Sequence, residues 1–417
     1  MPEFFNVLAP DMAKELLLGH TYHRTKVERI STFQALGRVT SSSISAPHDL
    51  PSFRRSSMDG YAVRASDTFG ASNSLPAILT IVGEVAMGSI AKVGLSAGEA
   101  ALIHTGGMIP LDADAVVQIE YTQTVGSKDV SRLPFEIEVF RPVAVGQNLL
   151  MVGEDVQEGS EVLPAGHYLR AQDIGGLLAL GITEIQVYTT PTIAIIATGD
   201  EIVEPTEALE YGQIRDINSY TIASLVSQNG GTPEICGIVN DEFDSLLAAA
   251  TNALYSHDML VITAGSSVSV RDMTVQVIDR LGDPGVLLHG VATRPGKPTV
   301  LGVVEGKPIL GLPGNPVSAM VQFLILGVPA IFRLQGAMTT PTRGSVQARV
   351  SRNVPSASGR EDYVPSRLIE TSEGLVAEPV FGKSNLIYTL VNAAGLLKVP
   401  INRNGFEAGE WVEVLLF

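Results

Sequence analysis

Apolar and polar stretches alternate most regularly between residues 181 and 334. Short apolar runs of β type lie at 192–197, 234–239, 259–263 and 308–310, and segments with helical spacing separate them. In one such segment Phe243, Leu246, Ala250 and Leu254 are three or four residues apart. Strands and helices that alternate in this way predict a parallel sheet with helices on both faces.

The flanking regions follow other patterns. Residues 1–46 predict helix, with Met12, Leu16 and Leu17 on one face and a second helical segment near 33–36. Residues 171–180 also have a helical pattern. Short β-type runs punctuated by Gly, Pro, Asp and Ser fill the remainder, at 77–82, 100–104, 115–120, 136–143, 345–350, 362–368, 375–379 and 411–415.

Together these patterns predict a multidomain fold of the α/β plus β class. Its centre is a doubly wound parallel α/β domain at 181–334, with helices on both faces of the sheet. A mostly-β domain at 47–146 is inserted into a discontinuous N-terminal domain made of 1–46 and 147–180. A small C-terminal β domain at 335–417, a barrel or a sandwich, completes the chain.

One stretch combines two glycines and two prolines: Gly311-Leu312-Pro313-Gly314-Asn315-Pro316-Val317-Ser318. It follows the predicted strand at 308–310 and precedes a helical pattern at 319–326. Glycine allows close approach of main chain to a ligand, and proline fixes φ and removes a donor. A strand, a glycine turn and a helix N-terminus predict an anion site. A tight loop that serves only packing is the alternative.

Polar or glycine-rich turns follow four of the predicted strands, at 198–201, 240–241, 264–272 and 311–318. In an open parallel sheet, ligands bind outside the carboxyl ends of the strands. The carboxylates Glu201, Asp241 and Asp272 have the wrong sign for direct phosphate contact, but they suit Mg²⁺ that bridges to phosphate. For each carboxylate alone, a solvated or helix-capping role is the alternative.

A compact basic motif, Arg294-Pro295-Gly296-Lys297-Pro298, lies between the third and fourth of these turns. Proline and glycine hold its two cations on a rigid loop, which suits a small tetrahedral oxyanion. An exposed basic loop without a ligand is the alternative.

Charge and cysteine content narrow the function classes. The formal net charge is −16, from 28 basic and 44 acidic residues, which argues against nucleic-acid and anionic-membrane partners. The single cysteine, Cys236, excludes an intrachain disulfide and fits a cytoplasmic location. The N-terminus lacks a basic start followed by an apolar core, so no signal peptide is expected. The longest apolar run, 323–332, is too short to span a bilayer.

In combination the motifs resemble the MoeA family of molybdenum transferases, which includes the E domain of gephyrin. The resemblance extends over essentially the whole chain, and the order of the motifs makes it specific. The matching stretches lie at 57–63, 105–117, 153–155, 198–201, 295–298 and 311–318.

The resemblance implies a MogA-like central domain and the metal-insertion step of molybdenum cofactor synthesis. Molybdenum from molybdate would enter adenylylated molybdopterin, AMP would leave, and Mg²⁺ would be the cofactor. The family is homodimeric, with an active site shared between subunits.

The same resemblance implies roles for individual residues. The expected catalytic residues are Asp59, Glu201, Asp241 and Asp272, of which the last three are also the expected metal ligands. The expected substrate-binding residues are Thr105, Asp155, Thr198, Gly199, Gly265, Ser267, Gly311, Pro313, Gly314, Asn315 and Pro316. The expected molybdate-binding residues are Arg294, Lys297, Pro298, Ser318, Arg360 and Ser384.

The chain departs from the family pattern at a few positions. Ser269 replaces a glycine ahead of Asp272, and Gly290 replaces a lysine that some members carry ahead of Arg294. His289 is a candidate to compensate for that missing charge. Two alternatives to molybdate insertion stay open: insertion of tungstate by the same chemistry, and a scaffold that keeps the fold without catalysis.

Overall fold

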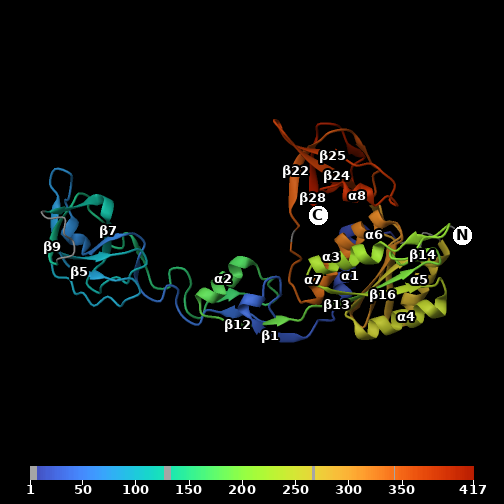
Figure 1. Cartoon of the computed structure of the whole chain (residues 1–417), viewed down its shortest axis with the longest axis horizontal. Coiled ribbons are helices and arrows are strands. Elements are labelled where there is room, and N and C mark those ends of the chain that lie inside the picture. Colours follow the sequence, from blue (N-terminus) through green and yellow to red (C-terminus); the bar gives the residue numbers. More distant parts are fainter. Residues whose placement is uncertain (1–6, 126–132, 265–267, 342) are drawn as a thin grey trace. The chain divides into compact units, whose positions relative to one another are not determined.

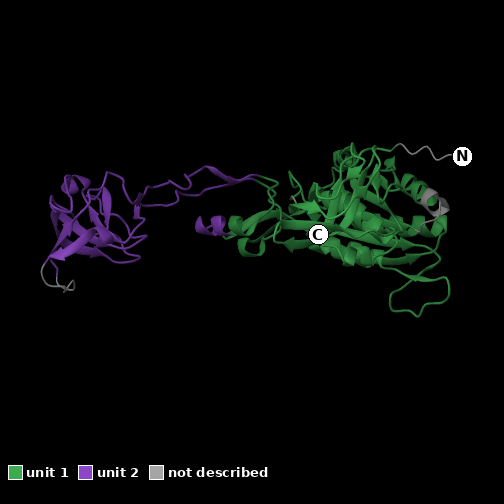
Figure 2. Cartoon of the chain, turned by 90° about the horizontal axis from the view of Figure 1, so that it is seen from above, with its two compact units in different colours: residues 1–42, 165–174, 183–417 green, residues 43–164, 175–182 purple. Residues whose placement is uncertain are grey.

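The computed structural model describes residues 7–125, 133–264, 268–341 and 343–417 (Figure 1). The side chains of 268–272 are outside this description. The chain forms two compact units, shown in separate colours in Figure 2. Unit 1 contains Met1–Ser42, Ala165–Ile174 and Thr183–Phe417, and unit 2 contains Ser43–Pro164 and Gly175–Ile182.

A six-stranded sheet forms the centre of unit 1. Its first four strands in spatial order are parallel, as predicted, and the last two are antiparallel to their neighbours. The fully parallel sheet expected from the sequence is therefore wrong at this edge, because the chain returns directly from β20 to β21 through the two-residue turn at Glu305 and Gly306. The strand order is β16 (Thr232–Val239), β13 (Thr192–Thr198), β17 (Met259–Ala264), β21 (Lys307–Pro313), β20 (Val300–Val304) and β18 (Pro284–His289).

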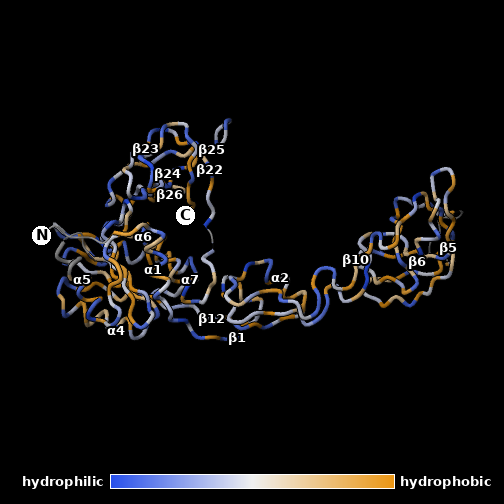
Figure 3. The backbone as a smooth tube through the Cα atoms, turned by 180° about the vertical axis from the view of Figure 1, so that it is seen from behind, coloured by the Kyte–Doolittle hydropathy of each residue, from blue (hydrophilic) through white to orange (hydrophobic). Residues whose placement is uncertain are grey.

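Helices cover both faces of this sheet, which makes it doubly wound. Side chains alternate along β13, so that Ile193 and Ile195 enter one core cluster and Ala194 and Ile196 enter the other. Figure 3 shows the apolar residues concentrated along these strands. Helices α4 (Phe243–Ser256) and α5 (Val268–Leu281) cover the second face; α1 (Pro10–His20), α3 (Asn218–Gln228), α6 (Pro316–Gln322) and α7 (Val328–Leu334) cover the first.

The first-face cluster contains a long apolar helical segment. Helices α6 and α7 are joined by a π-helical turn at Phe323–Gly327, so that Pro316–Leu334 is continuous. Length and composition would allow this helix to cross a membrane, the one such case among the described residues, but 83% of it is buried inside the protein. Its apolar character is therefore explained by the core.

The N-terminal prediction was partly wrong. The buried face of α1 contains Ala13 and Leu17, whereas Met12 is 57% exposed. In place of a second helix, β1 (Val27–Ser31) pairs with β12 (Glu184–Tyr188), and a single 3₁₀ turn at Thr32–Gln34 follows. The pairing is remote in sequence, so a local pattern could not reveal it.

The C-terminal strands close into a five-stranded barrel, which decides between barrel and sandwich. Pairing of β24 with β26 closes the ring, and β19 (Thr293–Arg294) of the α/β part adds to β24 as a parallel strand. The ring consists of β24 (Glu361–Thr371), β25 (Gly374–Pro379), β22 (Ser345–Val350), β28 (Trp411–Leu416) and β26 (Gly395–Val399). Beside it lie α8 (Tyr388–Val391) and the pair β23 (Val354–Pro355) and β27 (Gly405–Phe406).

Unit 2 is built around a second six-stranded sheet. Residues such as Val63, Ile81 and Ile137 form its buried core. The strand order is β7 (Ala115–Gln118), β4 (Gly60–Val63), β6 (Glu99–Ile103), β5 (Ala77–Val85), β9 (Phe135–Val139) and β8 (Thr122–Val125). The short pairs β2 (Ile44–Ser45) with β11 (Glu161–Leu163), and β3 (Arg55–Ser56) with β10 (Leu149–Leu150), extend from it. The chain also contains α2 (Ala171–Ala179) and, in unit 1, the parallel pair β14 (Ile202–Val203) and β15 (Ile214–Arg215).

Candidate functional site

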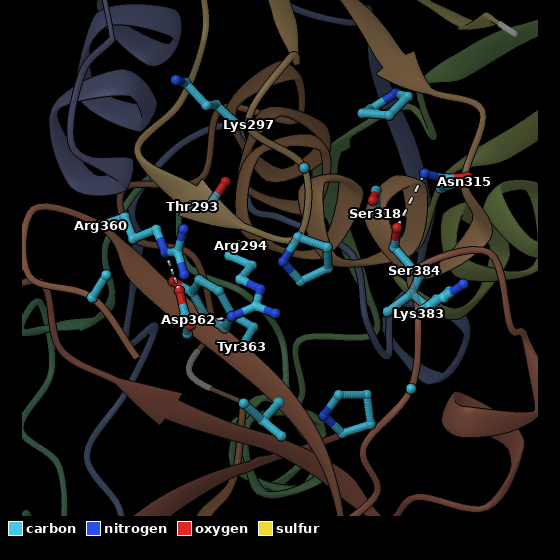
Figure 4. Close-up of a pocket in the computed structure, with 18 of the residues that line it drawn as sticks. Thr293, Arg294, Lys297, Asn315, Ser318, Arg360, Asp362, Tyr363, Lys383 and Ser384 are labelled. Atoms are coloured by element: carbon cyan, nitrogen blue, oxygen red, sulfur yellow. Dashed lines mark hydrogen bonds and ion pairs between the residues drawn. The ribbon is translucent and has the colours of Figure 1, made fainter. Parts of the chain in front are cut away.

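Within unit 1, the α/β part and the barrel together line a pocket of about 1020 Å³ (Figure 4). Four cationic side chains line it: Arg294 and Lys297 from the α/β part, and Arg360 and Lys383 from the barrel part. Asp362 is the one carboxylate among the described lining residues. The remaining lining residues include Thr293, Pro298, Pro313, Asn315, Ser318, Tyr363, Phe381 and Ser384.

A buried glutamine of α6, Gln322, hydrogen-bonds to the basic loop at 294–298 and to the residue before it. The Gln322 side-chain nitrogen donates to Thr293 Oγ1 at 2.9 Å and to the Pro295 carbonyl at 3.0 Å. Gly296 has a φ of +105°, and a Cβ at this position would overlap the Gln322 amide. The Thr299 hydroxyl donates to the Gly296 carbonyl at 2.7 Å, which closes the turn. These bonds connect the loop to α6 and close its turn, as a rigid loop would require.

The two arginines share one buried carboxylate. Arg360 Nε donates to Asp362 Oδ1 at 2.8 Å, and Arg294 Nη1 lies 3.6 Å from Asp362 Oδ2. The Asp362 side chain is 3% exposed, against 63% for Arg294 and 37% for Arg360. In Figure 4 the three side chains lie together, with dashed lines between them. The guanidinium groups therefore remain accessible from the pocket while their anchor does not.

A second wall of the pocket joins the start of α6 to the barrel part. Asn315 Nδ2 donates to Ser384 Oγ at 3.0 Å, and the Val317 amide donates to the Ser384 carbonyl at 3.1 Å. Ser318 is buried beside them. Ser318 and Ser384 thus bring two hydroxyl groups to the pocket that also holds the four cations.

The carboxyl ends of the parallel strands form a separate polar region of unit 1. The Thr198 hydroxyl at the end of β13 donates to Asp241 Oδ1 at 2.7 Å, and the Asp241 amide donates to Asp200 Oδ1 at 3.2 Å. Asn218 Nδ2 donates to the Gly314 carbonyl at 2.8 Å. Within the described part of the chain, the buried oxygens Asn218 Oδ1, Ser219 Oγ and Thr263 Oγ1 have no hydrogen-bond partner. Buried unpaired oxygens are costly, so they are consistent with a polar ligand at this edge.

The first part of the expected turn at 311–318 belongs to a strand. The strand β21 continues to Pro313, so Gly311 lies inside the sheet, where a Cβ would crowd Thr274 and Val300. Gly311 therefore has a packing reason to be glycine. Pro316 is the first residue of α6 and is buried. Gly199 and Glu201 follow β13 at the strand-end region.

Some expected residues belong to unit 2 or fall outside the description. Asp59 accepts hydrogen bonds from the Thr105 amide at 2.8 Å and the Thr105 hydroxyl at 3.2 Å, and these bonds lower the pKa of Asp59. Asp155 lines a shallow depression of about 490 Å³ in the same unit. Gly265 and Ser267 lie outside the described residues, as does the side chain of Asp272, whose backbone belongs to α5.

The metal prediction stays a prediction, because the side chain of Asp272 lies outside the described residues. Among described residues, no group of three His, Cys, Asp or Glu side chains is close enough to bind a metal. Glu201 and Asp241 follow the neighbouring strands β13 and β16, and their carboxylates are the hard oxygen donors that Mg²⁺ prefers. The donor chemistry therefore fits Mg²⁺, with Asp272 as the third expected ligand.

Sequence reasoning missed four features of these two regions. Asp362 and Lys383 line the pocket, but neither belongs to a motif that signals an oxyanion. Lys383 brings a fourth cation, whereas His289, the candidate to compensate for Gly290, lies on β18 and does not line the pocket. Gln322 lies in the segment 319–326 that the sequence predicts as helix, and no pattern there signals its contact with the basic loop. Asn218 and Ser219 at the start of α3 have buried oxygens in the strand-end region, and Asp216 accepts the Ser219 amide at 3.1 Å.

Comparison with known proteins explains this combination of domains. Residues 8–181 match the model of the MoeA N-terminal region (domain I and II), residues 194–333 that of a probable molybdopterin binding domain, and residues 347–417 that of the MoeA C-terminal region (domain IV). The fold and these matches define a transferase of molybdenum cofactor biosynthesis. The chain belongs to the MoeA family.

Two relatives and a solved structure are similar to this chain over nearly its full length. A molybdopterin biosynthesis protein of Methanocaldococcus jannaschii is 36% identical over 412 residues, covering 96% of this chain and 95% of the relative. The molybdopterin molybdenumtransferase of Bacillus subtilis is 32% identical over 399 residues, covering 95% and 91%. A crystal structure of the Pyrococcus horikoshii molybdopterin biosynthesis MoeA protein is 35% identical, with a TM-score of 0.75 and 99% of each chain covered.

Proposed function

We propose that this protein inserts molybdenum from molybdate into adenylylated molybdopterin and releases AMP. The observation that carries the proposal is the convergence of Arg294, Lys297, Arg360 and Lys383 on one pocket, in a chain whose net charge is −16. Four cations around one carboxylate are a local reversal of the overall charge, and they favour a small dianion. The hydroxyls of Ser318 and Ser384 are suited to bind its oxygens.

The proposed reaction balances without an oxidant or a reductant. Two molybdenum–sulfur bonds form at the dithiolene of the substrate, and one molybdate oxygen leaves as water with the two thiol protons. Hydrolysis of the phosphoanhydride consumes one water and releases AMP, and molybdenum stays at +6. Because the sulfurs belong to the substrate, the single cysteine of the chain, Cys236, has no part in metal insertion.

Pocket residues would act mainly by positioning. Fixed cations that hold molybdate beside the substrate offset its charge and reduce the entropy cost of bringing two anions together. The proposed substrate site extends to the strand-end region, where Thr198, Asn218 and Gly314 lie. The unpaired buried oxygens of that region support a polar ligand such as the pterin.

Glu201, Asp241 and Asp272 are proposed to hold Mg²⁺, whose charge would offset that on the phosphoanhydride oxygens. The Thr198 hydroxyl keeps Asp241 oriented, since it donates to Oδ1 at 2.7 Å and leaves Oδ2 for a cation. The unit 2 residues Asp59, Thr105 and Asp155 are proposed to complete the active site across a homodimer. A cytoplasmic location is part of the same proposal.

The test is a reconstituted reaction with purified protein, adenylylated molybdopterin, Mg²⁺ and molybdate. We expect AMP release that depends on molybdate, and a product that activates a molybdenum enzyme lacking its cofactor. Absence of AMP release with every divalent metal tried would refute the proposal. Competition between tungstate and molybdate for binding, measured in the same preparation, decides whether the pocket prefers one ion.

A control variant separates catalysis from scaffolding. Glu201→Gln removes a charge at the strand-end region without changing the oxyanion pocket, since Glu201 is not among its lining residues. We expect this variant to keep its circular dichroism spectrum and its molybdate affinity while it loses AMP release. Undiminished AMP release would remove Glu201 from the proposed mechanism.

A further inference from the structure

Asp362 presents an apparent contradiction in the oxyanion pocket. A carboxylate repels molybdate, yet this one lies in the wall of the pocket and touches two of its four cations. Its side chain is 3% exposed, so the negative charge itself faces protein and not solvent. Burial of a carboxylate is unfavourable unless cations and hydrogen bonds compensate, so its environment fixes the position of the group.

The backbone holds this carboxylate between two separate parts of the chain. Arg294 and Asp362 are directly opposite in the parallel pairing of β19 with β24, and residues opposite in a ladder point to the same face. Arg360 precedes β24 by one residue and donates to Asp362 Oδ1 at 2.8 Å. Each carboxylate oxygen therefore faces a different guanidinium group, one from the α/β part and one from the barrel part.

The geometry leaves most guanidinium donors available to a ligand. A guanidinium group carries five N–H donors, and Asp362 accepts only one hydrogen bond from Arg360. Both arginines stay partly exposed, at 63% and 37% of their side-chain surface. A free arginine would lose rotamer freedom when it bound an anion, whereas an anchored arginine has lost much of it before binding.

We infer that Asp362 is a positioning residue for molybdate binding, which pre-orients the guanidinium groups of Arg294 and Arg360 toward a shared oxyanion. The inference rests on the proposed function of the pocket. It adds a residue that touches no substrate and acts through two others. The β19–β24 pair places Arg294 of the α/β part opposite Asp362 of the barrel part.

Simple electrostatics and a positioning role predict opposite effects of an Asp362 substitution on molybdate binding. Asp362→Asn removes a negative charge from a pocket that binds a dianion, so simple electrostatics predicts tighter molybdate binding. If Asp362 acts by positioning, the same substitution weakens binding, because an amide holds guanidinium groups less firmly than a carboxylate does.

The experiment measures molybdate binding by calorimetry with the full chain, and kinetics with both substrates. For Asp362→Asn we expect the Kd and KM for molybdate to rise about tenfold. The KM for adenylylated molybdopterin should stay within about twofold, a separation that general damage to the fold would not produce.

The chain offers a matched control in the neighbouring residue. Glu361 is also buried on β24, lies 3.1 Å from Lys398 Nζ and accepts a hydrogen bond from the Tyr363 hydroxyl at 2.7 Å, but it does not line the pocket. Glu361→Gln should lower stability as Asp362→Asn does, while the molybdate Kd stays at the wild-type value.

The outcomes separate the inference from the proposed function. Wild-type protein that does not bind molybdate would refute the proposed pocket. Wild-type binding with an equal or lower Kd in Asp362→Asn would overturn the positioning role alone. If Asp362→Asn does not fold, Asp362→Glu replaces it, because it keeps the charge and shifts the carboxylate by one methylene. A severalfold higher Kd in Asp362→Glu supports positioning, and an unchanged Kd overturns it.

Discussion

Two buried aspartates of unit 1, Asp173 and Asp362, each contact two basic side chains, but these side chains come from different parts of the chain in the two cases. Asp173 accepts hydrogen bonds from Arg170 Nε at 2.9 Å and Nη2 at 3.0 Å, and its Oδ2 lies 2.9 Å from His167 Nε2. All three residues are close in sequence, with His167 and Arg170 just before α2 and Asp173 in its first turn. Asp362 instead joins Arg360, two residues away, to Arg294 of a distant segment.

The difference lies in how many donors each carboxylate uses. Asp173 accepts hydrogen bonds from two nitrogens of Arg170, and this bidentate geometry satisfies a guanidinium group most fully. Asp362 accepts a hydrogen bond from one nitrogen of Arg360, and its Oδ2 lies 3.6 Å from Arg294 Nη1. More guanidinium donors therefore remain for a ligand in the pocket. A saturated cluster stabilises a turn, whereas an unsaturated cluster at a pocket can bind a further anion. The same chemical group therefore serves stability in one place and recognition in the other.

The largest effect expected from this comparison is the loss of a pocket arginine. Arg294→Ala should raise the molybdate Kd about 100-fold, because it removes a charged donor and leaves Asp362 with one cation. Arg170→Ala removes a cation from the equivalent cluster at Asp173 and should leave molybdate affinity unchanged. Calorimetric titration with molybdate measures both. A similar loss of affinity in both variants would mean that the substitutions act through general destabilisation.

A smaller effect on molybdate affinity is expected when a substitution strains the loop that carries Arg294 and Lys297. Gly296→Ala would force an alanine to φ +105° and would overlap Gln322, so we expect a loss of about 1–3 kcal/mol in the free energy of unfolding. Molybdate affinity should fall about tenfold, since Arg294 and Lys297 flank this turn.

The control for that substitution is Gly409→Ala. Gly409 has a φ of +88°, but a Cβ there would have no neighbour within 4 Å. Gly409→Ala therefore measures the cost of backbone strain without a steric overlap. Denaturant unfolding compares the free energies of unfolding of Gly409→Ala and Gly296→Ala. Equal destabilisation would indicate that Gln322 moves aside freely, and molybdate affinity should then remain near the wild-type value.

The sequence predicted the α/β core well because its signals are local. Apolar runs such as 192–197 and 259–263 match β13 and β17 to within a residue, and the spacing from Phe243 to Leu254 matches α4. The errors concern long-range pairing. The pairing of β1 with β12 and the antiparallel edge formed by β20 and β18 depend on partners that no local pattern specifies.

The residues of the candidate site also differ in whether a local pattern or a distant contact reveals them. Arg294 and Lys297 were found from one short motif, because proline, glycine and two cations lie within five residues. Arg360 and Ser384 came only from the resemblance to a family. The position of Arg360 in the pocket depends on the β19–β24 pairing, and that of Ser384 on its hydrogen bonds to Asn315 and Val317. Asp362 and Lys383 escaped notice, because a carboxylate and a lysine on barrel segments are ordinary surface residues until the structure brings them to the pocket.

The smallest expected effect concerns the saturated cluster. Burial raises the pKa of Asp173, but the hydrogen bonds from Arg170 and His167 outweigh it and lower the pKa to about 2. A carboxyl group whose pKa is lower in the folded state stabilises that state above the unfolded value, near 3.8, and loses this contribution as the pH falls through about 2. Asp173→Asn should therefore lower the free energy of unfolding at pH 7 by on the order of 1–2 kcal/mol, after allowance for solvent screening.

The pH dependence distinguishes this mechanism from a packing defect. Urea unfolding of wild type and Asp173→Asn should converge between pH 4 and pH 2, whereas a packing defect would persist over the whole range. Asp11→Asn is the control, since Asp11 pairs with Lys14 at 2.8 Å on an exposed surface, and such pairs contribute about 0–1 kcal/mol. Molybdate affinity of Asp173→Asn should match that of the wild type. If it fell as far as in Asp362→Asn, an aspartate outside the pocket would affect binding as strongly as the one within it, and the contrast between the two clusters would be lost.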